Sequence, residues 1–238
     1  MTEKLYLVNS YMKECESKVT RAEGKEVVLD RTVFYPAGGG QPSDVGTIKA
    51  GGEVYSVVDA RKEGNDVVHV LDREAGGLAG RLVLCNIDWD RRYSLMRYHT
   101  AVHLIDAVFV NRYSGGQITG GQLYTDRARF DVDLDGFDRD TAARLIQEST
   151  LLGQEGHEVR AYALQREEAV KIAMLARTAP GRELLEKLDE VRVVEIVGVD
   201  MQADGGLHVR DTREIGIISL LKYTNNGRRH KRLEIKLS

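Results

Sequence analysis

The first ninety residues carry a succession of short β-strand patterns and no long helical one. Segments at residues 27–35, 52–58, 67–71 and 80–87 are rich in β-branched or aromatic side chains, and Gly, Asp or Asn bounds each of them. Short strands at this spacing are typical of a small barrel. The chain is therefore expected to begin with a β-barrel.

The pattern becomes helical near residue 90. From residue 90 to 110, apolar residues recur at helical spacing, and turn formers at 111–116 end the run. Asp88 or Asp90 suits the N-cap of this helix. Further helices are predicted at residues 140–152, 165–175 and 182–188, and strands at 191–197, 207–210, 215–222 and 232–237. The predicted fold is α+β, with a β-barrel domain at 1–89 and an α/β two-layer domain at 90–238.

Composition limits the class of protein. The chain has 238 residues, 42% of them hydrophobic and 30% charged, which is typical of a globular protein. No apolar run approaches the roughly 20 residues that span a bilayer, and the first residues lack a secretory apolar core, so a cytoplasmic protein is expected. Two cysteines exclude a disulfide scaffold and a Cys-rich zinc finger.

Two histidines lie four residues apart in the predicted helix. His99 and His103 therefore share one helical face, one turn apart, which is a common spacing for two imidazoles that bind one metal ion. Histidines at this spacing also occur on solvated helices. Ala101 and Val102 stand between them, so the His-Glu-x-x-His pattern of a zinc protease is absent.

A third histidine follows a pair of glycines. Gly205 and Gly206 would let the backbone approach a site closely, and His208 comes directly after them. Asp204 is a candidate carboxylate ligand or an acceptor for an imidazole N–H. Three histidines could supply an open zinc site, which takes three protein ligands and water. We assign no metal role to the remaining histidines, His69, His157 and His230.

Several motifs together resemble one family. Tyr-His-Thr-Ala-Val-His-Leu at 98–104, Arg-Phe-Asp at 129–131 and Asp-Gly-Gly-Leu-His-Val at 204–209 resemble, in order, motifs of the alanyl-tRNA synthetase editing domain. The Gly-Gly-Gly-Gln stretch within residues 29–44 resembles the loop of the barrel that precedes that domain, and residues 227–234 resemble its closing basic strand. A free-standing editing domain with its barrel is similar to the AlaX family of trans-editing deacylases.

This resemblance implies an activity and a cofactor. The family hydrolyses the ester of tRNA(Ala) mischarged with serine, and in some members with glycine, and it binds one zinc ion. Carried over, the zinc ligands are His99, His103 and His208. The family's Cys ligand is Asp204 here, so either Asp204 or water is the fourth ligand. The family's Thr is Leu207, which removes one hydroxyl.

Serine differs from alanine by one hydroxyl, which a substrate pocket can recognise by a hydrogen bond. Thr119, Thr100 and Gln122 are the candidates for that contact. Gly39, Gly40 and Gln41 form a glycine-rich loop that either contacts the acceptor stem or is a structural turn.

Charge is segregated along the chain although the net charge is only −3. Residues 222–238 hold six Lys and Arg against one Glu, whereas residues 131–140 hold five Asp against one Arg. We expect Arg228 and Arg229 to contact tRNA phosphates, and Arg91, Arg92 and Arg97 to extend that surface. Two alternatives stay open: a non-catalytic tRNA-binding module, and a zinc hydrolase that acts on another aminoacyl-tRNA.

Overall fold

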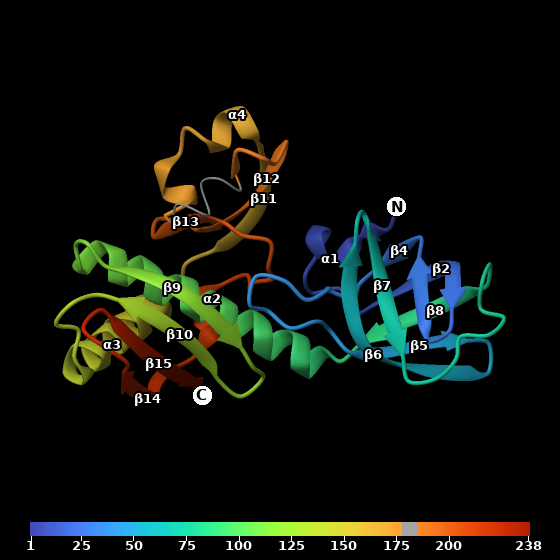
Figure 1. The fold of residues 1–238 in the computed structure, drawn as a ribbon, viewed down its shortest axis with the longest axis horizontal. Coiled ribbons are helices and arrows are strands. Elements are labelled where there is room, and N and C mark those ends of the chain that lie inside the picture. The colour runs from blue at the N-terminus through green and yellow to red at the C-terminus, as the bar shows by residue number, and fades with distance from the viewer. Residues whose placement is uncertain (178–184) are drawn as a thin grey trace. The chain divides into compact units, whose positions relative to one another are not determined.

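A computed structural model describes residues 1–177 and 185–238. The chain divides into two units, Met1–Leu95 and Met96–Ser238. In Figure 1 the colour runs from blue at the start of the first unit to red at the end of the second. Each unit is described by itself below.

The first unit is a closed antiparallel β-barrel, which confirms the predicted barrel. Six strands follow one another in the order β2-β3-β7-β6-β5-β8. A short helix and a pair of parallel strands also belong to this unit but are not part of the barrel. The bounds are β1 Glu3–Lys4, α1 Leu5–Val8, β2 Glu14–Glu23, β3 Glu26–Leu29, β4 Arg31–Thr32, β5 Gly46–Ala50, β6 Glu53–Glu63, β7 Asp66–Leu71 and β8 Leu82–Ile87.

Alternating side chains fill this barrel. Along β6, Tyr55, Val57 and Ala60 are buried while their neighbours are exposed or, at Arg61, half-buried, with a register shift after Val57. Gly46 allows the closest backbone approach: a Cβ atom there would lie 2.1 Å from the Asn86 carbonyl oxygen on β8. A side chain at this position would push β5 and β8 apart, so the sequence needs glycine here.

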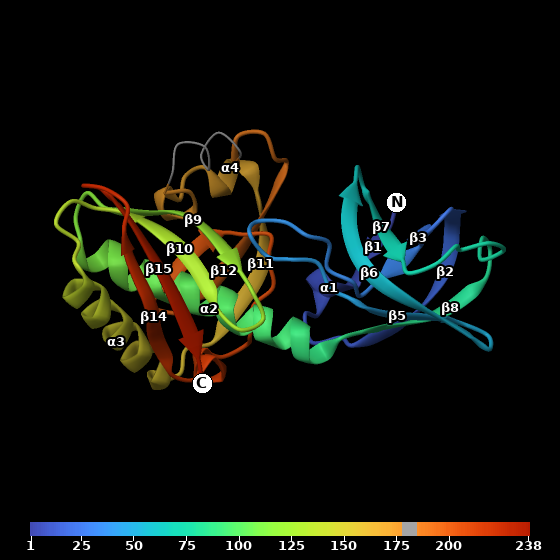
Figure 2. The same ribbon diagram turned by 60° about the horizontal axis from the view of Figure 1, so that its bottom comes forward.

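The second unit contains a four-stranded sheet in the order β14-β15-β10-β9. Its strands are β9 Gln117–Leu123, β10 Ala128–Asp133, β14 Ile218–Asn225 and β15 His230–Leu237. Helix α2, Trp89–Arg112, and helix α3, Arg139–Glu155, lie on one face of the sheet (Figures 1 and 2). Gly153 permits their contact, because an added Cβ would lie 3.0 Å from Leu104 Cδ2.

A smaller three-stranded sheet, β11-β12-β13, completes the second unit. Its strands are β11 Val159–Gln165, β12 Glu190–Ile196 and β13 Asp200–Ala203, and it is accompanied by α4 Arg166–Ala169, η1 Ala173–Leu175 and η2 Thr212–Ile215. Ala169, Leu175 and Val193 belong to one buried apolar cluster. Together the two units confirm the predicted α+β class.

Two of the predicted elements differ from those in the structure, and a third is described only in part. The helix expected at 165–175 is split into α4 and η1, because Ala169 and Leu175 both turn into the apolar cluster. The strand expected at 207–210 was wrong: the Val209 N–H donates to the Thr100 hydroxyl, 3.2 Å away, rather than to a neighbouring strand. Of the helix expected at 182–188, residues 182–184 lie outside the described residues, and the chain forms a turn at 186–187.

In the described part of the chain, no helix is both long enough and apolar enough to cross a membrane.

Candidate metal centre

Helix α2 presents two buried imidazoles on one face. His99 and His103 are one turn apart, with ring centroids 5.1 Å apart and 6% and 8% of each residue exposed. The helix is fixed at its start by Asp88, whose carboxylate accepts a hydrogen bond from the Arg91 N–H at 3.1 Å. The i, i+4 spacing read from the sequence therefore places both rings in the interior of the second unit.

The loop after β13 supplies the other two side chains. Asp204 and His208 flank Gly205 and Gly206, and the His208 ring centroid lies 4.4 Å from that of His99. A Cβ on Gly206 would lie 2.1 Å from His99 Cε1. The close backbone approach that the glycine pair predicts is confirmed, since any side chain at Gly206 would displace the ring.

Arg192 on β12 holds this loop in place. Its Nη1 donates to the Asp204 carbonyl at 2.9 Å and to the Gly206 carbonyl at 2.7 Å. In return, the Asp204 N–H donates to the Arg192 carbonyl at 3.1 Å. The guanidinium thereby fixes the backbone on both sides of Gly205, and with it the directions of the Asp204 and His208 side chains.

The four side chains converge on one point. The candidate ligand atoms of His99, His103, Asp204 and His208 all lie within 4.8 Å of one another. Asp204 Oδ2 lies 3.0 Å from His208 Nε2, and Asp204 Oδ1 lies 3.7 Å from His99 Nε2. Nitrogen and oxygen ligands about 2.1 Å from a tetrahedral ion lie about 3.4 Å apart, a value between these two distances.

Thr100 fixes the tautomer of His208. The Thr100 hydroxyl donates its one hydrogen to the Met96 carbonyl at 3.0 Å. It accepts from the Val209 N–H and lies 3.1 Å from His208 Nδ1, so Nδ1 must carry the hydrogen there. His208 Nε2 then presents a lone pair to the Asp204 carboxylate. Two lone-pair atoms 3.0 Å apart repel unless a cation or proton lies between them.

The same hydrogen bonds exclude Thr100 from substrate recognition. Its hydroxyl already donates once and accepts twice, which is its full capacity. The expectation that Thr100 contacts a substrate hydroxyl was therefore wrong.

Burial keeps the three imidazoles neutral. Desolvation lowers the pKa of His99 and of His103 below the usual value, and the Asp204 carboxylate opposes this shift in both. Desolvation and the neighbouring His99 lower the pKa of His208 further. Burial alone would raise the pKa of Asp204, but attraction between its carboxylate and any imidazole that is protonated, His99 first, lowers this pKa well below its usual value. Neutral imidazoles and a carboxylate are the protonation states that bind a divalent cation.

A second polar network adjoins this cluster. Asp106 lies three residues after His103 on α2, and Arg177 forms ion pairs with both Asp106 and Asp200. The Gln202 amide donates to Asp106 Oδ2 at 2.9 Å and to Asp200 Oδ2 at 2.7 Å. The network ties β13, the strand that leads into Asp204, to helix α2.

The predicted substrate residues on β9 lie outside the four-residue cluster. Thr119 is exposed on this edge strand, next to a register shift in the pairing with β10. Gln122 is half-buried, and its Nε2 donates to the Leu123 carbonyl at 3.3 Å. Contact of either residue with substrate stays a prediction.

The glycine-rich loop of the barrel is a tight turn. Gly38 and Gln41 exchange backbone hydrogen bonds of 3.0 Å, and Gly39 and Gly40 have φ values of +60° and +81°. These φ values favour glycine, so the structural reading of the loop has a physical basis. Gln41 is buried, while Gly39 is exposed. Their contact with tRNA stays a prediction.

Ion pairs join the segregated charges of the second unit. Arg228 pairs with Asp135, and Arg229 pairs with Asp133, at 2.7 and 2.6 Å. Arg232 pairs with Asp131 at 2.8 Å. The acidic segment thus lies against the basic strand. Phosphate contact by Arg228 and Arg229 stays a prediction, and it would have to compete with these carboxylates.

Arg92 is not a surface residue, contrary to the expectation. Its side chain is 0% exposed and forms an ion pair with Asp44 inside the first unit. Arg97 also forms hydrogen bonds within the protein: its guanidinium donates to the carbonyls of Glu214 and Ile215 at 2.8 and 2.7 Å.

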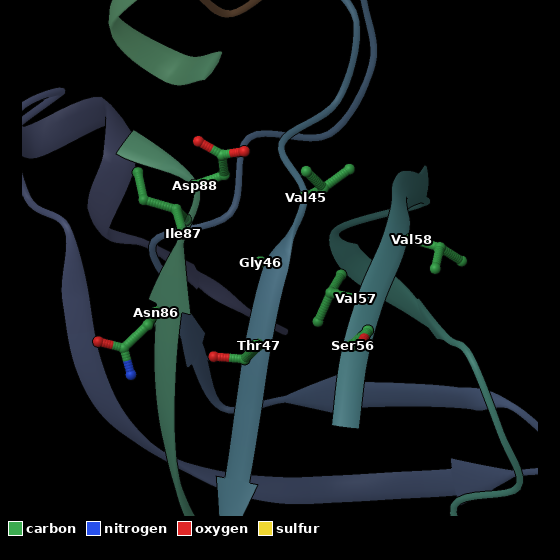
Figure 3. A pocket seen from close by; sticks show the side chains of 9 residues that line it. All are labelled: Val45, Gly46, Thr47, Ser56, Val57, Val58, Asn86, Ile87 and Asp88. Carbon is green, nitrogen blue, oxygen red and sulfur yellow. The ribbon is translucent and has the colours of Figure 1, made fainter. Parts of the chain in front are cut away.

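The barrel also carries a hollow of about 630 Å³. Figure 3 shows its lining, which is largely apolar and includes Val45, Val57 and Ile87. Its one carboxylate, Asp88, caps helix α2. The hollow therefore gathers no group of chemically active side chains comparable to the histidine cluster.

Comparisons with known proteins identify the family of the chain. Residues 2–91 match the family model of tRNA synthetases class II (A), and residues 191–234 match that of the threonyl and alanyl tRNA synthetase second additional domain. The alanyl-tRNA editing protein AlaX-M of Saccharolobus solfataricus is 41% identical, over 98% of both chains. The AlaX-M protein of Methanosarcina barkeri is 43% identical, over 100% of this chain and 99% of its own.

The chain belongs to the AlaX-M family of alanyl-tRNA editing proteins. The alanine–tRNA ligase of Ignicoccus hospitalis is also similar, with 35% identity over 92% of this chain but only 24% of the ligase. The resemblance inferred from the motifs is thus confirmed for the family.

Sequence reasoning missed several residues of this AlaX-M site. Arg192, Asp106 and Arg177 carry no motif of their own, and their roles follow only from the carbonyls and carboxylates that they meet. Thr100 stands between the two helix histidines in the sequence. Its position directly after His99 indicated that it lies near the site, but the predicted role was contact with the substrate hydroxyl and not orientation of His208.

Proposed function

We propose that this chain hydrolyses the ester bond of mischarged tRNA(Ala), with Ser-tRNA(Ala) as the main substrate and Gly-tRNA(Ala) as a second one. The proposal assigns one zinc ion to His99, His103 and His208, with Asp204 as the fourth ligand. The observation that carries it is the convergence of the candidate ligand atoms of His99, His103, Asp204 and His208 within 4.8 Å of one another, in a chain whose AlaX-M relatives are named alanyl-tRNA editing proteins.

The donor set fits zinc. Three imidazole nitrogens and one carboxylate oxygen are common ligands of this ion, and four ligands suit its tetrahedral geometry. All four side chains are mostly buried, so an uncompensated carboxylate among neutral imidazoles would be costly. When bound, zinc acts as a Lewis acid that polarises a carbonyl and lowers the pKa of water.

The residues of the chain prepare this site. Thr100 holds the hydrogen of His208 on Nδ1, which directs the lone pair of Nε2 toward the Asp204 carboxylate. The Gly206 N–H donates to Asp204 Oδ2 at 2.7 Å and orients that carboxylate. Arg192 fixes the loop from Asp204 to Gly206, so the ligand set is preorganised before substrate arrives.

Substrate recognition is assigned to residues outside the metal cluster. Thr119 or Gln122 would hydrogen-bond the serine hydroxyl and be left unpaired by alanine, which gives selectivity against the correct product. Arg228, Arg229 and the turn of Gly39, Gly40 and Gln41 would bind the tRNA backbone. The division of labour follows the proposed domains, a barrel at 1–89 and an editing domain at 90–238.

The experiment is a deacylation assay with a matched set of substrates. Ser-, Gly- and Ala-tRNA(Ala) are compared with a mischarged tRNA of another acceptor, before and after chelation and with zinc restored. We expect rapid loss of serine, slower loss of glycine and little loss of alanine, all abolished by chelation and recovered with zinc. Full activity in the zinc-free protein would overturn the cofactor assignment, and binding of tRNA without cleavage would favour a non-catalytic module.

A second assay addresses the serine hydroxyl. The variant Thr119→Val removes a hydroxyl while nearly conserving volume on an exposed strand position. We expect the ratio of Ser-tRNA(Ala) to Ala-tRNA(Ala) cleavage to fall, with unchanged zinc content. The control Thr119→Ser should retain the ratio. An unchanged ratio in Thr119→Val removes this residue from the pocket.

A further inference from the structure

The two cysteines of the chain lie directly opposite each other in the barrel. Cys15 on β2 and Cys85 on β8 are paired residues of the antiparallel ladder that joins these strands. Figure 1 shows the two strands side by side within the first unit. The fold thus brings together side chains that are far apart in the sequence, and neither belongs to the histidine cluster.

The backbone geometry at this pair suits a covalent link. The Ile87 N–H donates to the Lys13 carbonyl at 3.0 Å, which makes that neighbouring pair a hydrogen-bonded one. Pairs alternate along an antiparallel ladder, so Cys15 and Cys85, two residues further along each strand, also form a hydrogen-bonded pair. Cα atoms in such pairs are about 5.5 Å apart, inside the range of roughly 4.4–6.8 Å found for disulfides.

The sulfur atoms share one polar neighbour. The Ser17 hydroxyl lies 3.3 Å from Cys15 Sγ and accepts a hydrogen bond from Cys85 Sγ at 3.8 Å. Because both sulfurs meet the same small group, the two side chains turn toward each other and not to opposite faces of the sheet.

The two thiols differ in exposure and acidity. Cys15 is half-buried, and Cys85 is fully buried. The hydrogen bond with Cys85, opposed by burial and assisted by Ser17, lowers the pKa of Cys15 to about 7. The same hydrogen bond, together with burial, raises the pKa of Cys85. Cys15 is thus the accessible nucleophile, and Cys85 keeps its proton.

We propose that Cys15 and Cys85 form a reversible cross-strand disulfide, with a hydroperoxide as the oxidant. The Cys15 thiolate attacks one peroxide oxygen; an S–O bond forms, the O–O bond breaks, and the sulfur loses two electrons to the peroxide, whose other oxygen leaves as alkoxide or hydroxide and takes a proton from water. The Cys85 sulfur then attacks Cys15. An S–S bond forms, the S–O bond breaks, and the hydroxyl leaves with the Cys85 proton as water. A thiol reductant reverses the oxidation.

This site is separate from the editing chemistry. The disulfide would join β2 to β8, the two strands that close this part of the barrel. It would also protect Cys15 from oxidation beyond the sulfenic acid, because the second thiol is already in position.

The test treats the full-length reduced protein with one equivalent of hydrogen peroxide, then alkylates the remaining thiols under denaturing conditions. We expect both cysteines to escape alkylation, one peptide cross-link between Cys15 and Cys85, and full recovery of both thiols after dithiothreitol. A protein in which both thiols are still alkylated, or in which the link joins two chains on a non-reducing gel, would overturn the proposal.

Two variants establish the order of events. In Cys85→Ala, which removes only a sulfur from the core, Cys15 should accumulate a sulfenic acid that dimedone traps, although more slowly because the hydrogen bond that lowers its pKa is lost. In Cys15→Ser, Cys85 should resist both peroxide and dimedone in the folded protein. A reactive Cys85 together with an inert Cys15 would contradict the assigned roles. Should Cys85→Ala fold poorly, Cys85→Val supplies the same measurement.

Discussion

Two buried polar clusters, one in each unit, differ in whether their charges balance. In the first unit, Arg92 donates to both carboxylate oxygens of Asp44 and to the carbonyls of Ser10 and Val33, while Asp44 also accepts from the Tyr35 N–H. One positive and one negative charge match there, so the pair is neutral as a whole. A buried charge pair of this kind specifies the fold of the loops that it joins.

The histidine cluster of the second unit has the opposite character. The pKa values of His99, His103 and His208 are lowered and so is that of Asp204, so these four side chains carry a surplus of negative charge. Burial makes such a surplus unfavourable. Burial alone therefore does not distinguish structural from functional polar residues. The balance of charge does.

The largest expected effect is loss of the metal. His103→Ala should abolish zinc binding and lower the rate of Ser-tRNA(Ala) deacylation by more than about 1,000-fold, because a metal ion supplies several kcal/mol of transition-state stabilisation. Zinc content and single-turnover rates measure this. The control is His69→Ala, which removes a buried histidine of the barrel. It should lower stability and leave the zinc content unchanged. Equal zinc loss in both variants would show that zinc binding does not depend specifically on the histidine cluster.

The second largest effect is a loss of stability when Arg92 is replaced. Arg92→Ala leaves Asp44 as an unpaired buried charge and should lower the free energy of unfolding by about 3–5 kcal/mol. Urea denaturation measures this. The neighbouring variant Arg91→Ala removes a half-buried side chain that contacts the Ser43 carbonyl at 3.1 Å, and it should cost far less. Similar losses in the two variants would argue against the structural role of the pair.

A pH dependence follows from His69. Burial, partly offset by a hydrogen bond to Val27, lowers the pKa of His69 from 6.5 to about 4. Between these values the unfolded chain binds a proton that the folded chain does not, so stability falls as the pH falls through this window. The loss at pH 4 is about 3 kcal/mol. Denaturation at several pH values checks the slope.

The variant His69→Gln should remove most of that slope. The amide keeps a polar partner for the Thr32 hydroxyl, which lies 2.8 Å from His69 Nε2. The site histidines, whose pKa values are also lowered, add to the slope in the metal-free protein. An unchanged slope in the variant, measured with zinc bound, would show that another group titrates there.

The smallest effect is expected for Arg192. Arg192→Met keeps most of the side-chain volume but removes the hydrogen bonds to the Asp204 and Gly206 carbonyls. Because the residue orients ligands and binds no metal itself, zinc affinity should fall about 10- to 100-fold. Competition with a coloured chelator measures it. Rescue of activity by excess zinc is expected; a loss that zinc does not restore would indicate a different role.

Much of the architecture could be predicted from local patterns. Alternation and turn residues indicated the barrel, and helical spacing indicated the helix that became Trp89–Arg112. Strand β2, Glu14–Glu23, was missed, because its inward positions are held by Cys15, Ser17 and Val19 among charged neighbours, which is a weak apolar signal. The strand expected at 207–210 failed because Thr100, distant in sequence, takes the Val209 N–H.

The sequence by itself determined the family, the α+β class and the three histidines, because motif order and i, i+4 spacing survive without coordinates. Only the tertiary structure decided which polar residues complete one another. Arg92 and Arg228 look alike in sequence, yet one is buried against Asp44 and the other is exposed beside Asp135. The hydrogen on His208 and the pairing of Cys15 with Cys85 depend on partners from distant segments. Such contacts arise from packing, which local sequence does not encode.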